Sequence, residues 1–234
     1  MNPTRLLLTL ASALLLLAGT GCKSTSPPLV LLPPLNATNG YAKEMLAFEA
    51  KDAAHPPPKN PIVFTGSSSF RLWTNVTSDF PGLGVVNTGF GGSQLSDVRE
   101  HFERVILKYR PRQVLLYCGG NDLNAKKPVA QVVGDLKAIV ERIHRELPKT
   151  QVTYVSIALN PARWTQRGQI LQANAEIQRF MSADPRRRYV DITQVMLEAD
   201  GTPKPDIFVA DKLHMNRKGY ELWIPVLRPH LRPR

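Results

Sequence analysis

Cysteine is scarce in this sequence: Cys22 and Cys118 are the only two among 234 residues. Cys118 stands in the apolar run QVLLYCGG, where we expect a small buried hydrophobic residue without a disulfide partner. Cysteines and histidines do not cluster at the spacing of a zinc site, so we expect no metal and no cofactor. The scarcity of cysteine thus argues against both a disulfide-stabilised and a zinc-stabilised scaffold.

Acidic residues are also few: the sequence has 19 aspartates and glutamates but 30 lysines and arginines, which gives a formal net charge of +11. Such an excess can indicate nucleic-acid binding. The basic residues are dispersed, however, apart from the run Arg186, Arg187 and Arg188, and the export signal described next argues against nucleic acid. Two interpretations stay open: attraction to anionic lipid, cell-wall polymer or an acidic substrate, and a solvated surface without a partner.

Long apolar runs are missing except near the N-terminus. Residues 6–18 are apolar, follow the basic Arg5 and precede small residues, which is the pattern of a signal peptide over residues 1–22. The run is shorter than the ~20 residues of a membrane span. A retained N-terminal anchor helix is the alternative interpretation.

The end of this segment, LAGTGC, resembles a bacterial lipobox. The resemblance implies that Cys22 is lipidated, becomes the mature N-terminus and anchors the protein to a membrane of the cell envelope. Lys23 would favour the outer membrane in a Gram-negative cell. Simple cleavage without lipidation is the alternative.

The rest of the chain divides into a tether and one domain. Residues 23–39 contain four prolines and no helical period, which predicts an extended linker. Residues 40–234 alternate between short apolar runs and amphipathic segments. Strands are predicted at 61–66, 84–88, 113–118, 151–159 and 188–192, and helices at 41–53, 95–106, 129–147, 170–181 and 220–227.

Strands that are apolar on both faces and separated by amphipathic helices predict a parallel sheet with helices on both sides. We therefore expect an α/β domain with three α/β/α layers and a five-stranded parallel sheet. We take its strand order to be flavodoxin-like, 2-1-3-4-5. In such sheets ligands bind at the carboxyl ends of the strands.

Polar and glycine-rich loops follow the predicted strands. GSSS (66–69) follows the first strand, NTGFGGS (87–93) the second and GGND (119–122) the third, and DKLHMN (211–216) lies near the end of the chain. With the order above, the first three loops are neighbours and the serines lie in the middle.

These loops contain the residue types needed for nucleophilic catalysis by a serine. A serine hydroxyl becomes a useful nucleophile when a base such as His214 takes its proton, and Asp211 can hold the imidazole in the required tautomer. Backbone N–H groups and the Asn121 amide can stabilise the resulting oxyanion. The residues alone do not say which of the three serines reacts.

The four loops resemble, in order, the four blocks of the SGNH/GDSL hydrolases, a family of serine esterases. IVFTGSSSFRLW is similar to the first block, NTGFGGS to the second, GGND to the third and DKLH to the last. The resemblance implies that Ser68 is the nucleophile, His214 the base and Asp211 its partner. It also implies an oxyanion hole formed by the N–H groups of Ser68 and Gly92 and the side chain of Asn121.

One position departs from the family pattern, because Ser67 stands where these esterases usually have an aspartate. We expect Ser67 to form the turn or to support the site, Ser69 to cap a short helix beginning at FRLW, and Asp122 to be structural. Trp164 is expected either to line the substrate cleft or to pack.

The remaining large or titratable residues are expected to be structural. Trp73 and Trp223 are predicted to lie in the core. Solvated positions are predicted for the histidines outside the site, namely His55, His101, His144 and His230.

Taken together, the sequence predicts an exported cell-envelope esterase that cleaves short acyl esters of a glycan or small molecule through an acyl-enzyme. The alternative is a catalytically silent envelope lipoprotein that binds glycan or lipid. The sequence predicts no nucleic-acid partner, and it leaves the oligomeric state open.

Overall fold

Five parallel strands form one sheet in the computed structural model, which describes residues 30–35 and 40–233. The strands are β1 (Ile62–Gly66), β2 (Val85–Gly89), β3 (Gln113–Tyr117), β4 (Gln151–Val155) and β5 (Arg187–Val190). Their order is β2-β1-β3-β4-β5, which confirms the predicted flavodoxin-like arrangement. Cys22 and the proposed signal peptide lie outside the described residues.

The three neighbouring strands β2, β1 and β3 end at the same level. Gly66, the last residue of β1, is in register with Gly89 of β2 and with Tyr117 of β3. The loops that leave these strands therefore start side by side at one edge of the sheet.

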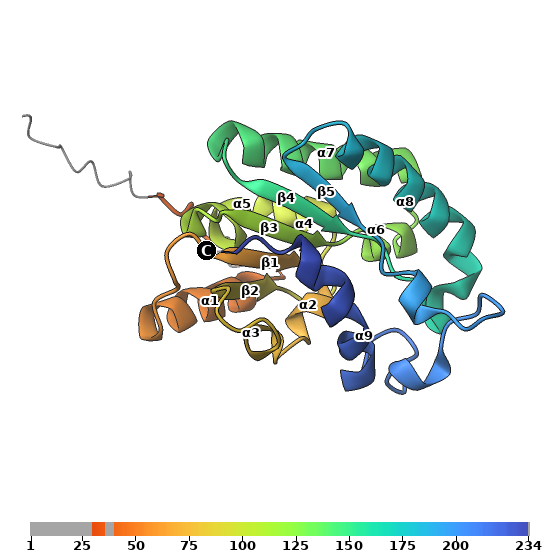
Figure 1. The fold of residues 1–234 in the computed structure, drawn as a ribbon. Coiled ribbons are helices and arrows are strands. Elements are labelled where there is room, and N and C mark those ends of the chain that lie inside the picture. The colour runs from red at the N-terminus through yellow and green to blue at the C-terminus, as the bar shows by residue number, and fades with distance from the viewer. Residues whose placement is uncertain (1–29, 36–39, 234) are drawn as a thin grey trace, which may run out of the picture.

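Helices cover both faces of the sheet, so the predicted three layers are confirmed (Figure 1). On one face Phe70, Trp73 and Trp223 belong to a core with Leu115 of β3, while Val114 and Leu116 of the same strand enter the core of the other face. This alternation explains why the strands are apolar throughout. The first face carries α2 (Ser68–Arg71), α3 (Val76–Asp79) and α9 (Arg217–Leu227), and the second carries α4 (Leu95–Glu100), α5 (Phe102–Val105), α7 (Val129–Glu146) and α8 (Arg167–Ser182).

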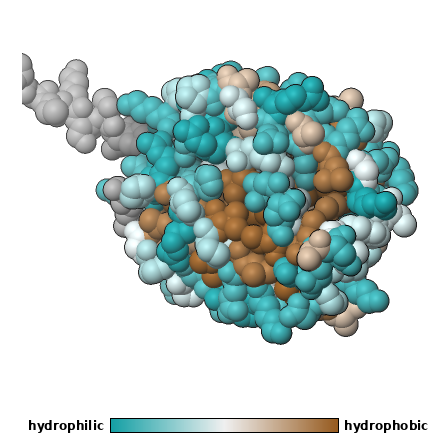
Figure 2. Space-filling view, turned by 45° about the vertical axis from the view of Figure 1, so that its right-hand side comes forward, coloured by the Kyte–Doolittle hydropathy of each residue, from teal (hydrophilic) through white to brown (hydrophobic). Residues whose placement is uncertain are grey.

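Two further helices complete the fold: α1 (Ala42–Ala54) and α6 (Gly120–Asn124). Met45 of α1 is fully buried in the core of the second face. In the view of Figure 2, apolar side chains form a band across the middle of the molecule, with hydrophilic residues above and below it. No helix within residues 30–35 and 40–233 is long and apolar enough to cross a membrane.

The fourth strand is shorter than predicted. β4 ends at Val155, although the apolar sequence continues to residue 159. Beyond Val155 the backbone finds other partners: the Asn174 side chain accepts the N–H of Ile157 at 2.8 Å and donates to its carbonyl at 2.9 Å. Ile157, Ala158 and Leu159 stay buried after the strand ends. At Ile157 the Asn174 side chain supplies the backbone hydrogen bonds that a neighbouring strand would otherwise provide.

Two of the predicted surface histidines are buried. The exposed fraction is 4% for His101 and 9% for His144, so the prediction of solvated side chains is wrong for both. The backbone leaves the helical region at His101, which divides the predicted helix 95–106 into α4 and α5. The His101 ring then packs edge-on against Tyr41 and Phe90, a contact with the segment before α1 that helical periodicity cannot reveal. Trp73, Trp223 and Cys118 are buried as predicted.

Candidate active site

A glycine turns the chain from β1 into the first loop of the site. Gly66 has φ of +122°, and a Cβ atom there would lie 2.1 Å from the carbonyl oxygen of Tyr117. Only glycine fits both requirements. The next residue, Ser67, donates its N–H to that same carbonyl at 2.9 Å, so the start of α2 is tied to the end of β3.

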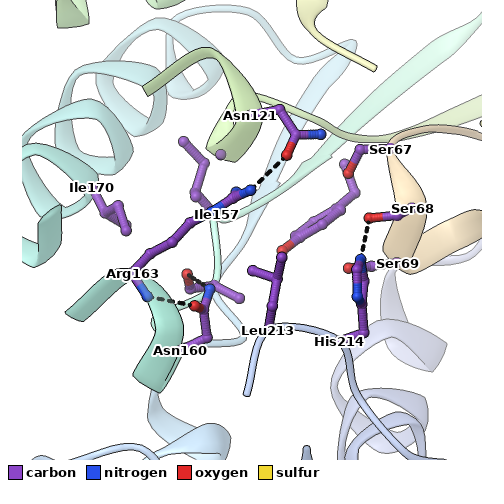
Figure 3. Close-up of a pocket in the computed structure, with 13 residues that line it drawn as sticks. Ser67, Ser68, Ser69, Asn121, Ile157, Asn160, Arg163, Ile170, Leu213 and His214 are labelled. Atoms are coloured by element: carbon purple, nitrogen blue, oxygen red, sulfur yellow. Dashed lines mark hydrogen bonds between the residues drawn. The ribbon is translucent and has the colours of Figure 1, made fainter. Parts of the chain in front are cut away.

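Ser68 is the first residue of α2, and its half-buried hydroxyl points toward His214 (Figure 3). The Oγ atom lies 2.8 Å from Nε2 of the imidazole. Two side chains hold the helix: Asn87 donates to the carbonyl of Phe70 at 2.6 Å, and the Tyr220 hydroxyl donates to the carbonyl of Ser69 at 2.8 Å.

Asp211 holds the other side of the imidazole. Its Oδ2 atom is 2.6 Å from Nδ1 of His214, and its Oδ1 atom accepts the N–H groups of Leu213 and His214, each at 2.9 Å. These bonds to His214 and Leu213 lower the pKa of Asp211 to about 2, so the carboxylate is ionised at neutral pH. An ionised carboxylate at Nδ1 favours the proton there, which leaves Nε2 as the acceptor for the Ser68 hydroxyl.

Asn121 and Gly92 border the same space from the neighbouring loops. Asn121, near the start of α6, donates from Nδ2 to the Ser93 carbonyl at 2.9 Å and accepts from Arg163 at Oδ1 at 2.8 Å. Gly92 has φ of +76° and lines a depression together with Ser68. The side-chain amide and the glycine backbone therefore border the same depression as Ser68.

Two spaces of very different size meet at Ser68. The first is a small cavity of about 20 Å³, lined among others by Tyr117, Gly120 and Leu213. The second is an open depression of about 390 Å³, which also reaches Glu44 and Arg71. Both spaces are bordered by Ser68, Asn121, Arg163, Leu213 and His214.

Of three residues that neighbour the site, only Ser69 departs from expectation. Ser69 does not cap a helix beginning at FRLW, because α2 begins at Ser68 and Ser67 occupies the N-cap position without a side-chain cap bond. Asp122 is fully buried, accepts the Leu95 N–H and pairs with Lys127 at 2.8 Å, in agreement with a structural role.

Sequence reasoning overlooked Arg163, which lines both spaces. Its position in NPARW after the fourth strand carries one usable signal: an Asn-Pro step begins a turn, and the Asn160 side chain accepts the Arg163 N–H at 3.0 Å. Trp164 next to it is partly buried against the core, as the packing interpretation predicts, and it lines an apolar groove with Pro161 and Phe208 that does not include Ser68 or His214. Within the described ranges, no group of three or more histidine, cysteine or acidic side chains could hold a metal ion.

Comparison with known proteins identifies the fold and the family. The rat (Rattus norvegicus) platelet-activating factor acetylhydrolase IB subunit alpha1 is 27% identical over 218 residues, which cover 87% of each chain. The crystal structure of a GDSL-like lipase from Bacteroides thetaiotaomicron superimposes with a TM-score of 0.68 at 19% identity and covers 80% of this chain and 96% of the other. A catalytic mutant of an acetylxylan esterase from Geobacillus stearothermophilus gives a TM-score of 0.61 at 16% identity, over 74% and 94% of the two chains.

These structures share the five-stranded α/β/α architecture described above. The GDSL-like Lipase/Acylhydrolase family itself matches residues 55–222, a segment that contains all four loops of the site. The chain therefore belongs to the GDSL-like lipase/acylhydrolase family and is a carboxylic ester hydrolase.

Proposed function

We propose that Ser68 is the nucleophile of this hydrolase and that the substrate is an ester of a short acyl group. The observation that carries the first part is the continuous hydrogen-bonded line from Ser68 Oγ to His214 Nε2 at 2.8 Å and from Nδ1 to Asp211 at 2.6 Å. A binding protein has no need for a base beside a hydroxyl. Neither the comparisons nor this geometry favours the catalytically silent alternative.

In the proposed reaction, Ser68 Oγ attacks the ester carbonyl carbon while its proton passes to Nε2 of His214. The tetrahedral oxyanion accepts hydrogen bonds from the N–H groups of Ser68 and Gly92 and from Nδ2 of Asn121. Collapse breaks the bond to the alcohol, which leaves with the proton from His214. Water activated by the same imidazole then hydrolyses acyl-Ser68 and releases the acid.

The proposal of a short acyl group rests on the size of the small cavity. Its volume of about 20 Å³ compares with the roughly 10–15 Å³ that a single water molecule needs. A space of this size suits the methyl group of an acetyl ester. The alcohol part would lie in the open depression, where Glu44 and Arg71 offer polar contacts to a sugar or another small alcohol. Two proteins similar to this chain carry names of the same kind: an acetylhydrolase and an acetylxylan esterase.

The assignment of the nucleophile is tested with p-nitrophenyl acetate and a fluorophosphonate probe of serine hydrolases. We expect Ser68→Ala to abolish both turnover and labelling, because the hydroxyl is removed. Ser67→Ala is the matched control in the same turn and is expected to retain both. Normal turnover by Ser68→Ala together with an inactive Ser67→Ala would refute the assignment.

The acyl preference is tested with p-nitrophenyl esters of acetate, propionate, butyrate and hexanoate. Each methylene beyond the cavity must displace its wall at a cost of about 1–3 kcal/mol, or roughly 5- to 150-fold in kcat/KM. We expect kcat/KM to fall at each step. A butyrate ester that is hydrolysed as well as acetate would contradict the proposal, and acetylated glycans assayed beside lysophospholipids would then identify the natural class of ester.

We further propose that the protein is exported and anchored in the cell envelope by a lipid on Cys22. The lipobox-like sequence is the support for this proposal, since Cys22 lies outside the described residues. The test is metabolic labelling of the full chain with an alkyne fatty acid, followed by membrane fractionation. Cys22→Ser is expected to lose the label and to leave the membrane fraction, and labelling that persists in this variant would refute the proposal.

A further inference from the structure

Arg163 presents a guanidinium group to the amide of Asn121 from the other side of the pocket (Figure 3). Its Nη2 atom donates to Oδ1 of Asn121 at 2.8 Å. The amide nitrogen of Asn121 donates at the same time to the Ser93 carbonyl at 2.9 Å. With the oxygen and one N–H of the amide held in this way, the amide plane is fixed and its second N–H is left for a substrate oxygen.

The local backbone is built to bring Arg163 to this place. Arg163 lies in a 3₁₀ segment, Pro161–Gln166, and interrupts its helical conformation with φ of −119° and ψ of 22°. The Asn160 side chain, only 5% exposed, accepts the N–H of Arg163 and fixes the kink. A Cβ atom at Gly120 would lie 3.1 Å from Nη1 of Arg163, so the glycine before Asn121 leaves room for the guanidinium.

The guanidinium has no acidic partner in the described part of the chain. No carboxylate there lies within ion-pair distance of Arg163, although the residue is partly buried. Burial also lowers the pKa of Arg163, which reports the cost of desolvating this cation. A partly buried cation without a counter-ion is unfavourable in the resting enzyme. That cost falls once negative charge develops nearby, as it does on the ester oxygen during acyl transfer.

We propose that Arg163 is a positioning residue of the oxyanion hole, which locks the Asn121 amide and strengthens its N–H as a donor to the tetrahedral intermediate. This inference rests on the proposed function of Ser68 and Asn121. A hydrogen bond from a cation to Oδ1 draws electron density from the amide and makes its remaining N–H a better donor. This stabilisation acts in the transition state and not in the bound substrate, so replacing Arg163 should change kcat more than KM.

The test compares Arg163→Met with Arg167→Met in the full chain. Arg167 carries the same charge at the start of α8 and lies over the Trp164 ring at 5.3 Å, without a bond to Asn121. We expect Arg163→Met to lower kcat for p-nitrophenyl acetate about 10- to 100-fold, less than the 10²- to 10³-fold typical when an oxyanion donor itself is deleted. KM should stay within about twofold, and Arg167→Met should change neither value by more than about twofold.

Two measurements separate this role from a purely structural one. Added guanidinium ion should restore part of the kcat of Arg163→Ala, because it can occupy the vacated space and donate to Asn121. In the Asn121→Ala background, Arg163→Met should have almost no further effect on kcat, since the residue acts through Asn121.

Each outcome bears on one proposal only. An unchanged kcat in Arg163→Met, or equal losses of kcat with and without Asn121, would overturn the role of Arg163 while leaving the Ser68 mechanism intact. A wild-type enzyme whose Ser68 resists the fluorophosphonate probe would instead refute the proposed nucleophile. A variant that merely folds poorly is recognised by a lower melting temperature without rescue by guanidinium, and that result also counts against the proposal.

Discussion

Replacing Asp211 by asparagine should inactivate the enzyme more thoroughly than removing the side chain altogether. The carboxylate has two tasks: Oδ1 accepts hydrogen bonds from two backbone N–H groups, and Oδ2 accepts a hydrogen bond from Nδ1–H of His214. An asparagine keeps the first task only if its oxygen stays at the Oδ1 position. Its NH₂ group then faces Nδ1 and donates to it, which moves the imidazole proton to Nε2. A protonated Nε2 cannot take the proton of Ser68.

The expected loss of kcat in Asp211→Asn follows from the wrong tautomer of the His214 imidazole. A comparable Asp→Asn change in a serine protease lowers kcat by about 10⁴, which corresponds to about 5.4 kcal/mol of transition-state stabilisation. Asp211→Ala behaves differently because the side chain of Asp211 is 46% exposed. Water can then enter, accept a hydrogen bond from Nδ1–H and preserve the productive tautomer. We therefore expect Asp211→Ala to stay more active than Asp211→Asn, because it keeps the productive tautomer.

The assay is kcat/KM for p-nitrophenyl acetate at neutral pH, with the concentration of active sites determined by fluorophosphonate titration. Thermal unfolding serves as the control, and both variants should melt close to the wild type because the replaced carboxylate is largely solvated. An Asp211→Asn enzyme as active as Asp211→Ala, or more active, would refute the tautomer reasoning. It would mean that the charge of Asp211, and not the direction of its hydrogen bond, supports His214.

Three further predictions concern stability and are checked by chemical or thermal unfolding. The bidentate contact with Arg217 lowers the pKa of Asp79, so its stabilising effect should be present above the unfolded-state pKa of about 4 and fall away at lower pH; Asp79→Asn should flatten that dependence. Asp122→Ala leaves the Leu95 N–H without its buried acceptor and Lys127 with only its longer ion pair to Asp135 at 3.9 Å, and it should cost about 3 kcal/mol; a loss below about 1 kcal/mol would contradict this role. Gly66→Ala adds a methyl group in a left-handed turn against a backbone oxygen and should cost about 3 kcal/mol or more, whereas a normal melting temperature would show that the strand end can move.

The loops of the site could be predicted from the sequence because parallel strands collect their carboxyl ends at one edge of the sheet. If the strand order is flavodoxin-like, 2-1-3-4-5, as the structure confirms, the loops containing Ser68, Gly92 and Asn121 must be neighbours. The structure adds the register, which ends all three strands at the same level. It also adds the distances among Ser68, His214 and Asp211, which depend on how the last loop folds back over β1 and are not encoded in any local pattern.

Features that depend on tertiary contacts could not be predicted from the sequence. His101 stands at a polar position of an amphipathic pattern, yet the rings of Tyr41 and Phe90 cover it. The apolar run 151–159 looks like a long strand, yet the backbone of Ile157 bonds to the Asn174 side chain instead of a neighbouring strand. In both cases a contact with a residue distant in the chain decides the structure, and the local hydrophobic periodicity carries no information about such contacts.

Arg163 shows the same limit at the site itself. An arginine between β4 and α8 is expected to be solvated. Nothing in the sequence NPARW indicates that Arg163 bonds to a residue 42 positions earlier in the chain. The contact exists because Asn160 fixes the kink that points Arg163 at Asn121 and because Gly120 has no side chain to obstruct it. The two glycines of the GGND block thus have different uses: Gly119, with φ of +124°, allows the tight turn, and Gly120 makes room for a cation behind the oxyanion donor. An alanine at Gly120 would test the room for the guanidinium alone, since the backbone of Gly120 is helical and accepts any residue. We expect Gly120→Ala to fold normally and to lower kcat by displacing the guanidinium from Asn121.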